Sequence, residues 1–225
     1  MIYICTHTDF EEQKRFKDGY TILSCKPLQK QYSAPVEVIS DNDLTPMQYA
    51  YAEGYHIWHI WHNKHDEWVG INQYRKYFEN VPQYRTVLPV PRKYNMHDGY
   101  AYAHNINDLL ECEQIIDEFY PQYKCDYASL RLSHCNMFVM RWHDFEEYCK
   151  FVFGVLERFN ERHNLHTDED VYKFVERRYD QYSHRHDVRY QSRLHGFLFE
   201  RLGTIFFNTY FNVEHRKIHF VGERV

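Results

Sequence analysis

The chain has 225 residues, of which 44% are hydrophobic and 26% are charged, a balance that excludes a disordered chain. Its formal net charge of -5 argues against binding to duplex DNA by electrostatics alone. The six cysteines form no C-x-x-C pair, and the sequence has neither a signal peptide nor an apolar run of about 18 residues. We therefore expect a single cytoplasmic domain over residues 1–225, with free thiols and no membrane span.

The first predicted element is an apolar strand over residues 1–5, which runs directly into a polar loop. An α/β domain that binds a nucleotide commonly begins this way, although no glycine-rich phosphate loop is present. His7 in this loop is a candidate contact to a nucleotide diphosphate. The alternative is a loop histidine that bonds only to backbone groups.

A strand over residues 36–40 leads into the tripeptide Asp41-Asn42-Asp43. Carboxylates in a D-x-D pattern are hard oxygen ligands that hold Mg²⁺ or Mn²⁺ against a diphosphate, where the cation neutralises the charge of the leaving nucleotide. Asp41 and Asp43 are therefore candidate metal ligands. A helix-capping turn explains Asp43 equally well, so a metal-independent site is an equal expectation. In that case Arg75 and Lys76 supply the cations, because a guanidinium suits phosphate oxygens.

One helix is predicted from Thr45 to about Asn63. Thr45 is expected as its N-cap, and Gln48 falls where a capping-box partner would lie. Histidines recur at every third position from 56 to 65, but each such step turns the side chain by about 60°, so four cannot converge on one ion. We interpret them as packing or surface residues.

A buried strand over residues 68–71 is predicted next, and polar residues up to Lys76 follow at its carboxyl end. Ligands bind at that end of the strands in open α/β sheets. Residues 92–105 have no apolar periodicity and are expected to form a polar and aromatic loop, our candidate for an acceptor lid. Helices are predicted over residues 107–119, 142–163 and 194–207.

Two features of the C-terminal third carry possible chemistry. Glu200 lies in an apolar helix segment, where a buried acid must be paired or functional. Residues 177–193 contain five arginines with interleaved tyrosines, a pattern that suits a nucleic-acid strand or an anionic donor. The alternative for this stretch is a solvated helix face.

Two runs of the sequence resemble motifs of a known family. Residues 53–63 carry a pair of tryptophans, and residues 70–78 read G-I-N-Q-Y-R-K-Y-F. They resemble C-E-L-T-x-x-Y-W-x-W-K-N and G-L-C-H-Y-R-R-Y-F of the small glycosyltransferase-like domain in bacterial capsular and exopolysaccharide synthesis proteins, galactofuranosyltransferases among them. The chain departs from these motifs at Gln73, where the family has His, and at His62, where it has Lys. Further agreement follows in the expected order at His7 and residues 136–140, 145–148 and 196–202.

The resemblance implies an α/β fold of the GT-A-like type, with a mostly parallel sheet flanked by helices. It also implies transfer of a furanose or hexose from a nucleotide diphosphate sugar, with UDP as the expected nucleotide, to a hydroxyl of a polysaccharide or other glycan. This chemistry needs a cradle for the diphosphate and a group that takes the hydroxyl proton. We assign the residues as follows: for the diphosphate His7, Arg75 and Lys76, with Arg193 and Arg201 in second rank; for the sugar Tyr74, His134 and Asn136; for the base Asp41, Asp43 or Glu200.

Two other functions remain open at this point. A compact chain rich in His and Tyr also fits a bacteriophage enzyme that transfers arabinose or glucose to hydroxymethylated cytosine in DNA. A flipped base would then enter the pocket, and residues 92–105 and 177–193 would meet the DNA. The second alternative is a non-catalytic module that binds glycan or nucleic acid and has kept the fold.

Overall fold

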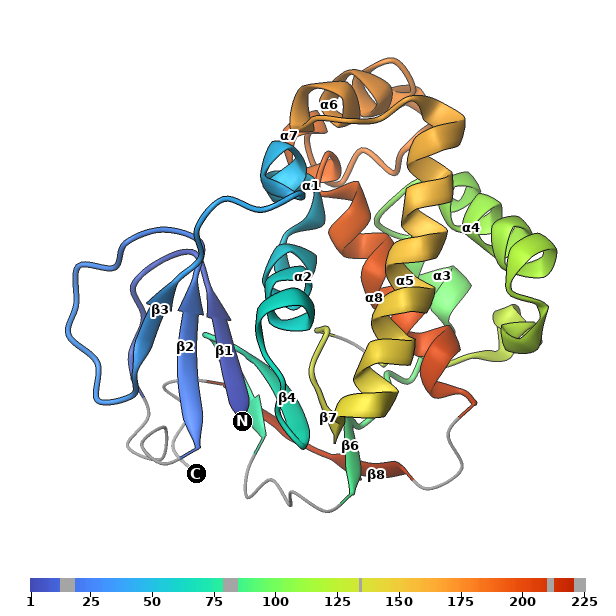
Figure 1. Cartoon of the computed structure of the whole chain (residues 1–225). Helices are drawn as coiled ribbons and strands as arrows, with labels where there is room; N and C mark the ends of the chain where they lie inside the picture. Colours follow the sequence, from blue (N-terminus) through green and yellow to red (C-terminus); the bar gives the residue numbers. More distant parts are fainter. Residues whose placement is uncertain (13–18, 79–84, 134, 210–212, 221–225) are drawn as a thin grey trace.

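The computed structural model describes residues 1–12, 19–78, 85–133, 135–209 and 213–220 (Figure 1). Within these residues, nine strands form one sheet in which the order β3-β2-β1-β4-β7-β6-β8 is continuous, and β5 pairs with β4 and β9. The strands are β1 Ile2–Thr6, β2 Tyr20–Ser24, β3 Val36–Val38, β4 Trp68–Gln73, β5 Lys76–Phe78, β6 Thr86–Pro89, β7 Phe138–Arg141, β8 Val213–Arg216 and β9 Ile218–Phe220.

The sheet is mixed. Parallel pairing joins β3, β2, β1 and β4, and it also joins β6 to β8. Antiparallel pairing joins β4 to β5 and β7, β7 to β6, and β5 to β9. The expected parallel arrangement is thus found in β3-β2-β1-β4 and in the β6–β8 pair, while the other pairs are antiparallel. Phe138 at the start of β7 pairs with Ile71 near the end of β4, so the chain enters β7 from the carboxyl edge of β4 and must run in the opposite direction.

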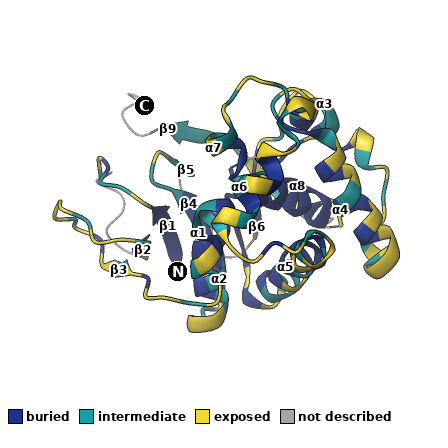
Figure 2. Cartoon of the chain, turned by 90° about the horizontal axis from the view of Figure 1, so that it is seen from above, coloured by how far each residue is buried: buried dark blue, intermediate teal, exposed yellow. Residues whose placement is uncertain are grey.

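The helices cover one face of this sheet (Figures 1 and 2). They are α1 Gln48–Tyr51, α2 Glu53–Asn63, α3 Met96–Ala101, α4 Ile106–Phe119, α5 Trp142–His163, α6 Asp168–Glu176, α7 Val188–Gln191 and α8 Leu194–Phe207, with short 3₁₀ turns at Thr45–Met47, Pro121–Tyr123, Tyr127–Ser129 and Tyr179–Gln181. None of the described helices has the length and apolarity needed to cross a membrane.

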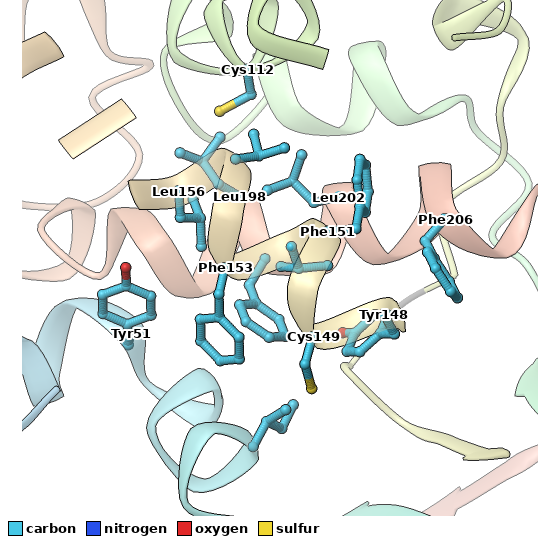
Figure 3. Packing of buried hydrophobic residues seen from close by; sticks show 14 of the residues in the cluster. Tyr51, Cys112, Tyr148, Cys149, Phe151, Phe153, Leu156, Leu198, Leu202 and Phe206 are labelled. Carbon is cyan, nitrogen blue, oxygen red and sulfur yellow. The ribbon is translucent and has the colours of Figure 1, made fainter. Parts of the chain in front are cut away.

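The main hydrophobic core lies between this face of the sheet and the helices. Figure 3 shows Phe153 and Leu156 of α5 near Leu198 and Leu202 of α8. Alternate strand residues such as Tyr3 point into the same cluster. The opposite face carries two smaller clusters, whose buried members come from strands and loops. Because α8 lies at the centre of the helical layer, twelve of its fourteen residues are buried and it has no polar face.

The prediction of one helix from Thr45 to Asn63 is wrong. A 3₁₀ turn over Thr45–Met47 is followed by α1, which ends at Tyr51; Ala52 separates the two helices, and α2 begins at Glu53. Thr45 does not cap this helix; its hydroxyl oxygen instead accepts the amide of Asn42, at 2.8 Å. The expected loop over residues 92–105 is also wrong, since it contains α3, whose first turn is capped by the side chain of Asn95.

Candidate active site

A cavity of about 510 Å³ opens at the carboxyl ends of β1, β2 and β4. Because these three strands are parallel neighbours, their carboxyl ends meet at one edge of the sheet. The sheet side of the cavity consists of Cys5, Thr6, His7, Cys25 and Tyr74. The facing wall comes from the helical layer and includes Tyr49, Glu53, His56, Asp168, Tyr190 and Arg193.

Glu53 reaches the cavity because the chain turns sharply at Ala52. Ala52 has φ 50° and ψ -117°, a left-handed conformation that strains a residue with a side chain. Gly196 at the start of α8 packs here, and a Cβ at position 196 would lie 2.9 Å from the Cβ of Ala52. α8 therefore packs closely against Ala52, the residue that separates α1 from α2, and Glu53 is the first residue of α2.

The Glu53 carboxylate is held from two sides. Gln73 Nε2 donates a hydrogen bond of 3.1 Å to Glu53 Oε1, and the same nitrogen donates to the carbonyl of Cys135 at 3.0 Å. Arg193 Nη2 lies 3.8 Å from Glu53 Oε2, within reach of an ion pair but beyond a hydrogen bond. Glu53 Oε1 is thus fixed by Gln73, while Glu53 Oε2 accepts no hydrogen bond from the described residues.

The pKa of His7 reflects its burial and the charged groups around this cavity. Partial burial lowers the pKa of His7 below its usual value, Glu53 opposes the change, and Lys26, Arg193 and Arg75 lower the pKa further. These three cations therefore lie close enough to act on one imidazole. The ring of His7 also makes an edge contact with Tyr74, with centroids 5.4 Å apart.

His56 fixes the loop that carries His7. Its Nε2 donates to the carbonyl of Thr6 at 3.0 Å, and burial lowers the pKa of His56 to about 4. The imidazole is therefore neutral at pH 7. In the described part of the chain, no group of three or more His, Cys, Asp or Glu side chains is placed to hold a metal ion.

An arginine lies beside the cavity on the helical side. The guanidinium of Arg189, which precedes the cavity residue Tyr190, lies 3.8 Å from the ring centre of Tyr49, another residue of the lining. Asp168 at the start of α6 accepts the backbone amides of Tyr49 and Ala50, at 3.0 and 2.8 Å. Asp168 therefore joins α6 to the first turn of α1.

The structure divides the predicted site residues into separate groups. His7, Tyr74 and Arg193 line the cavity, and Arg75 lies outside the lining with its guanidinium 5.0 Å from the ring centre of Tyr74. A second group surrounds Cys135, behind Gln73. Its members are Lys76, Asn136, Glu200 and Arg201.

The second group contacts a loop whose backbone is strained. Cys135 and Asn136 both have positive φ, 74° and 49°. The Cys135 amide donates to Glu200 Oε1, Lys76 Nζ donates to Cys135 Sγ at 2.9 Å, and the other Glu200 oxygen pairs with Arg201 at 2.7 Å. Glu200 is thus paired, as its apolar surroundings require, but it does not line the cavity.

Asp41 and Asp43 are exposed in the turn before the first 3₁₀ segment and do not line the cavity. The backbone of this turn is held by Asn42, whose side-chain oxygen accepts the Leu44 amide at 2.9 Å. A metal site at these aspartates stays a prediction. His134 lies outside the described residues.

The sequence reasoning did not select several cavity residues. Glu53 stands at the start of the first run that resembles the family motif, so that motif could have identified it. Tyr190 lies within the basic stretch 177–193, next to the predicted Arg193. Lys26, which acts on His7 from outside the lining, follows the end of β2, so its position after a parallel strand could have identified it. Asp168 had no comparable signal, because it reaches the site only through the fold.

The chain was also compared with known proteins. A family model described as a domain of unknown function (DUF4422) matches residues 79–213. The apo structure of the bifunctional glycosyltransferase WbbM is similar, with a TM-score of 0.72 and 18% sequence identity; the match covers 99% of this chain and 45% of that one. The chain thus spans less than half of that protein's length. At this identity the likeness confirms the GT-A-like α/β fold. No curated protein matches the sequence.

Proposed function

We propose that this chain, which belongs to the DUF4422 domain family, is a glycosyltransferase that moves a sugar from a nucleotide diphosphate sugar to an acceptor hydroxyl. One observation carries the proposal. The cavity at the carboxyl edge of β1, β2 and β4 combines Arg193, the carboxylates of Glu53 and Asp168, and tyrosine rings on a GT-A-like fold. Its volume of about 510 Å³ lies within the range of small-molecule sites.

Cations beside the donor diphosphate stabilise the negative charge that builds up on it as the nucleotide leaves. Arg193 lines the cavity. Arg75 and Lys26 lie outside the lining but close enough to lower the pKa of His7. These side chains would hold the phosphates without a metal ion, since arginine forms paired hydrogen bonds with phosphate oxygens. Asp41 and Asp43 with Mn²⁺ or Mg²⁺ are the alternative. We propose a UDP-sugar as donor, with Tyr74 and Tyr190 as stacking surfaces for its rings.

We propose a glycan as the acceptor. DNA is a second candidate, because Arg189 beside the cavity lies over the ring of Tyr49 and forms no ion pair with a carboxylate among the described residues. Arginines and aromatic rings in this arrangement suit a phosphate backbone and unstacked bases. DNA binding whose affinity falls steeply with salt would favour this acceptor, whereas salt-independent binding of a neutral glycan would favour the first.

The direct test is a screen of the purified chain against nucleotide sugars, by thermal shift and by mass spectrometry of the products, with Mn²⁺ and with EDTA. We expect one nucleotide sugar to raise the melting temperature and to be turned over. Arg193→Ala should weaken its binding by about 10- to 100-fold, the loss expected for a charge-assisted hydrogen bond. Arg158, which stacks on Phe119 away from the cavity, provides the control variant Arg158→Ala.

The results of this screen distinguish a transferase from a binding module, and a metal site from an arginine site for the diphosphate. No stabilisation by any nucleotide sugar would refute the proposal and favour a binding module. Loss of turnover in EDTA would move the diphosphate site to Asp41 and Asp43, while full activity in EDTA would support the arginine cradle.

A further inference from the structure

We infer that Glu53 is the general base of the proposed transfer and that Gln73 is its positioning residue. This inference rests on the proposed function, because it assigns a step of that reaction. None of the acids selected from the sequence lines the cavity, so the reaction needs another carboxylate there.

Glu53 and Asp168 are the acids among the described cavity residues. Both oxygens of Asp168 accept backbone amides, so this carboxylate is committed to holding α1. Glu53 differs, because among the described residues only its Oε1 accepts a hydrogen bond, while Oε2 lies 3.8 Å from Arg193. The Glu53 side chain is 24% exposed and can therefore be reached by an acceptor hydroxyl.

The orientation of Glu53 is fixed by its neighbours. Gln73 Nε2 uses one hydrogen for Glu53 and the other for the Cys135 carbonyl. Two acceptors on one nitrogen determine which way the amide faces, and they make it a donor toward Glu53. Such a donor fixes Glu53 Oε1 and leaves Oε2, which lies 3.8 Å from Arg193, as the oxygen that can take a proton.

The backbone on both sides of this pair is strained. Ala52 precedes Glu53 with positive φ, and Cys135, which holds Gln73, has positive φ as well. Left-handed conformations persist at residues with side chains only where surrounding contacts impose them, and they concentrate at functional sites. Here the contacts are Gly196 against Ala52, and the Glu200 carboxylate on the Cys135 amide.

The step balances as a single displacement. The acceptor oxygen attacks the anomeric carbon and forms the new C–O bond, while its proton passes to Glu53 Oε2. The bond between the anomeric carbon and the phosphate oxygen breaks, and its electron pair leaves with the nucleoside diphosphate. Arg193 lies beside Glu53 and would face the departing phosphate. Attack from the opposite side inverts the configuration at the anomeric carbon.

The test uses the full chain and the donor screen of UDP-hexoses and UDP-pentoses, with water as acceptor, so that slow hydrolysis to UDP measures turnover. Glu53→Gln should keep donor binding and the melting temperature but lose turnover by about 10²- to 10⁴-fold, the usual worth of a general base. Glu53→Asp should retain part of the activity. Glu161→Gln removes an exposed carboxylate of α5 and should behave as wild type.

Gln73→Ala tests the positioning role. Turnover should fall with little change in donor affinity, and Gln73→Asn should restore less than full activity because its amide is shorter. Turnover of Glu53→Gln within threefold of wild type would overturn the base assignment. So would a folded Glu53→Gln that no longer binds donor, or a product with retained configuration. Failure of the wild type to bind or hydrolyse any donor would instead refute the proposed function itself.

Discussion

Three of the buried histidines should make the folded chain sensitive to mild acid. His56, His104 and His195 are at most 6% exposed, and burial is the first cause that lowers their pKa values, to about 4, 3 and 3. Among the described residues, His104 donates to Gln191 at 2.7 Å and His195 donates to Asn160 at 2.5 Å. An unfolded histidine has its ordinary pKa of about 6.5. The unfolded chain therefore binds more protons between about pH 4 and 6.5, and the free energy of unfolding falls as the pH drops through this window.

The size of the effect follows from the gap between pH and the unfolded pKa. At pH 5, about 1.5 units below 6.5, each histidine removes about 2 kcal/mol, because one pKa unit corresponds to about 1.4 kcal/mol. Three of them remove about 6 kcal/mol, which is comparable with the total stability of an ordinary domain. Burial also raises the pKa of Asp108 and Glu113, which acts in the opposite direction, so a comparison between variants is needed.

His195→Gln isolates one histidine, since the amide can still donate to Asn160 but does not titrate. Urea unfolding at pH 7.5 and pH 5 should show that the wild type loses about 2 kcal/mol more than this variant over the same interval. His143→Gln removes an exposed histidine at the start of α5 and should lose as much as the wild type. Equal losses in the wild type and His195→Gln would refute the reasoning.

Three further outcomes follow from local geometry. Gly70→Ala should destabilise the sheet by about 1–3 kcal/mol, because the new Cβ would lie 2.9 Å from Ile2; urea unfolding measures it, and an unchanged midpoint would show that the strands relax. Asp168→Ala should cost about 1–2 kcal/mol, as two amides of α1 lose their acceptor, and Asp168→Asn should recover part of the loss in the same assay. Arg189→Ala should reduce the salt dependence of DNA binding if DNA is the acceptor, and should leave glycan binding unaffected.

The long elements were predictable from the sequence because their pattern is strong. The predicted ranges 142–163 and 194–207 coincide with α5 and α8, where many turns repeat the same apolar spacing. The break at Ala52 was not predictable, since neither glycine nor proline stands there and the conformation accompanies the packing of Gly196. α3 was missed because a helix of six residues buries only Met96 and Tyr100, too few positions to establish a period.

The candidate site was predictable where a residue follows the end of a parallel strand. His7 and Tyr74 satisfy that rule and line the cavity. Asp41 and Asp43 were selected from a tripeptide alone, and the structure places them in an exposed turn. Glu53 was passed over because an acid in the first turn of a helix is ordinary, and only the tertiary fold shows that it faces Gln73 and Arg193.

The hydrogen bonds around Gln73 connect the cavity to Glu200, a residue that is distant in sequence and was predicted as a candidate base. Glu53 accepts from Gln73, Gln73 donates to Cys135, and the Cys135 amide donates to Glu200. This line begins at α2, crosses the end of β4 and ends in α8, so it joins the parallel part of the sheet to the loop that enters the antiparallel β7. The role left to Glu200 is then indirect: it holds the Cys135 backbone, whose carbonyl orients Gln73. The geometry of the acid in the cavity therefore depends on a second acid that never touches the cavity.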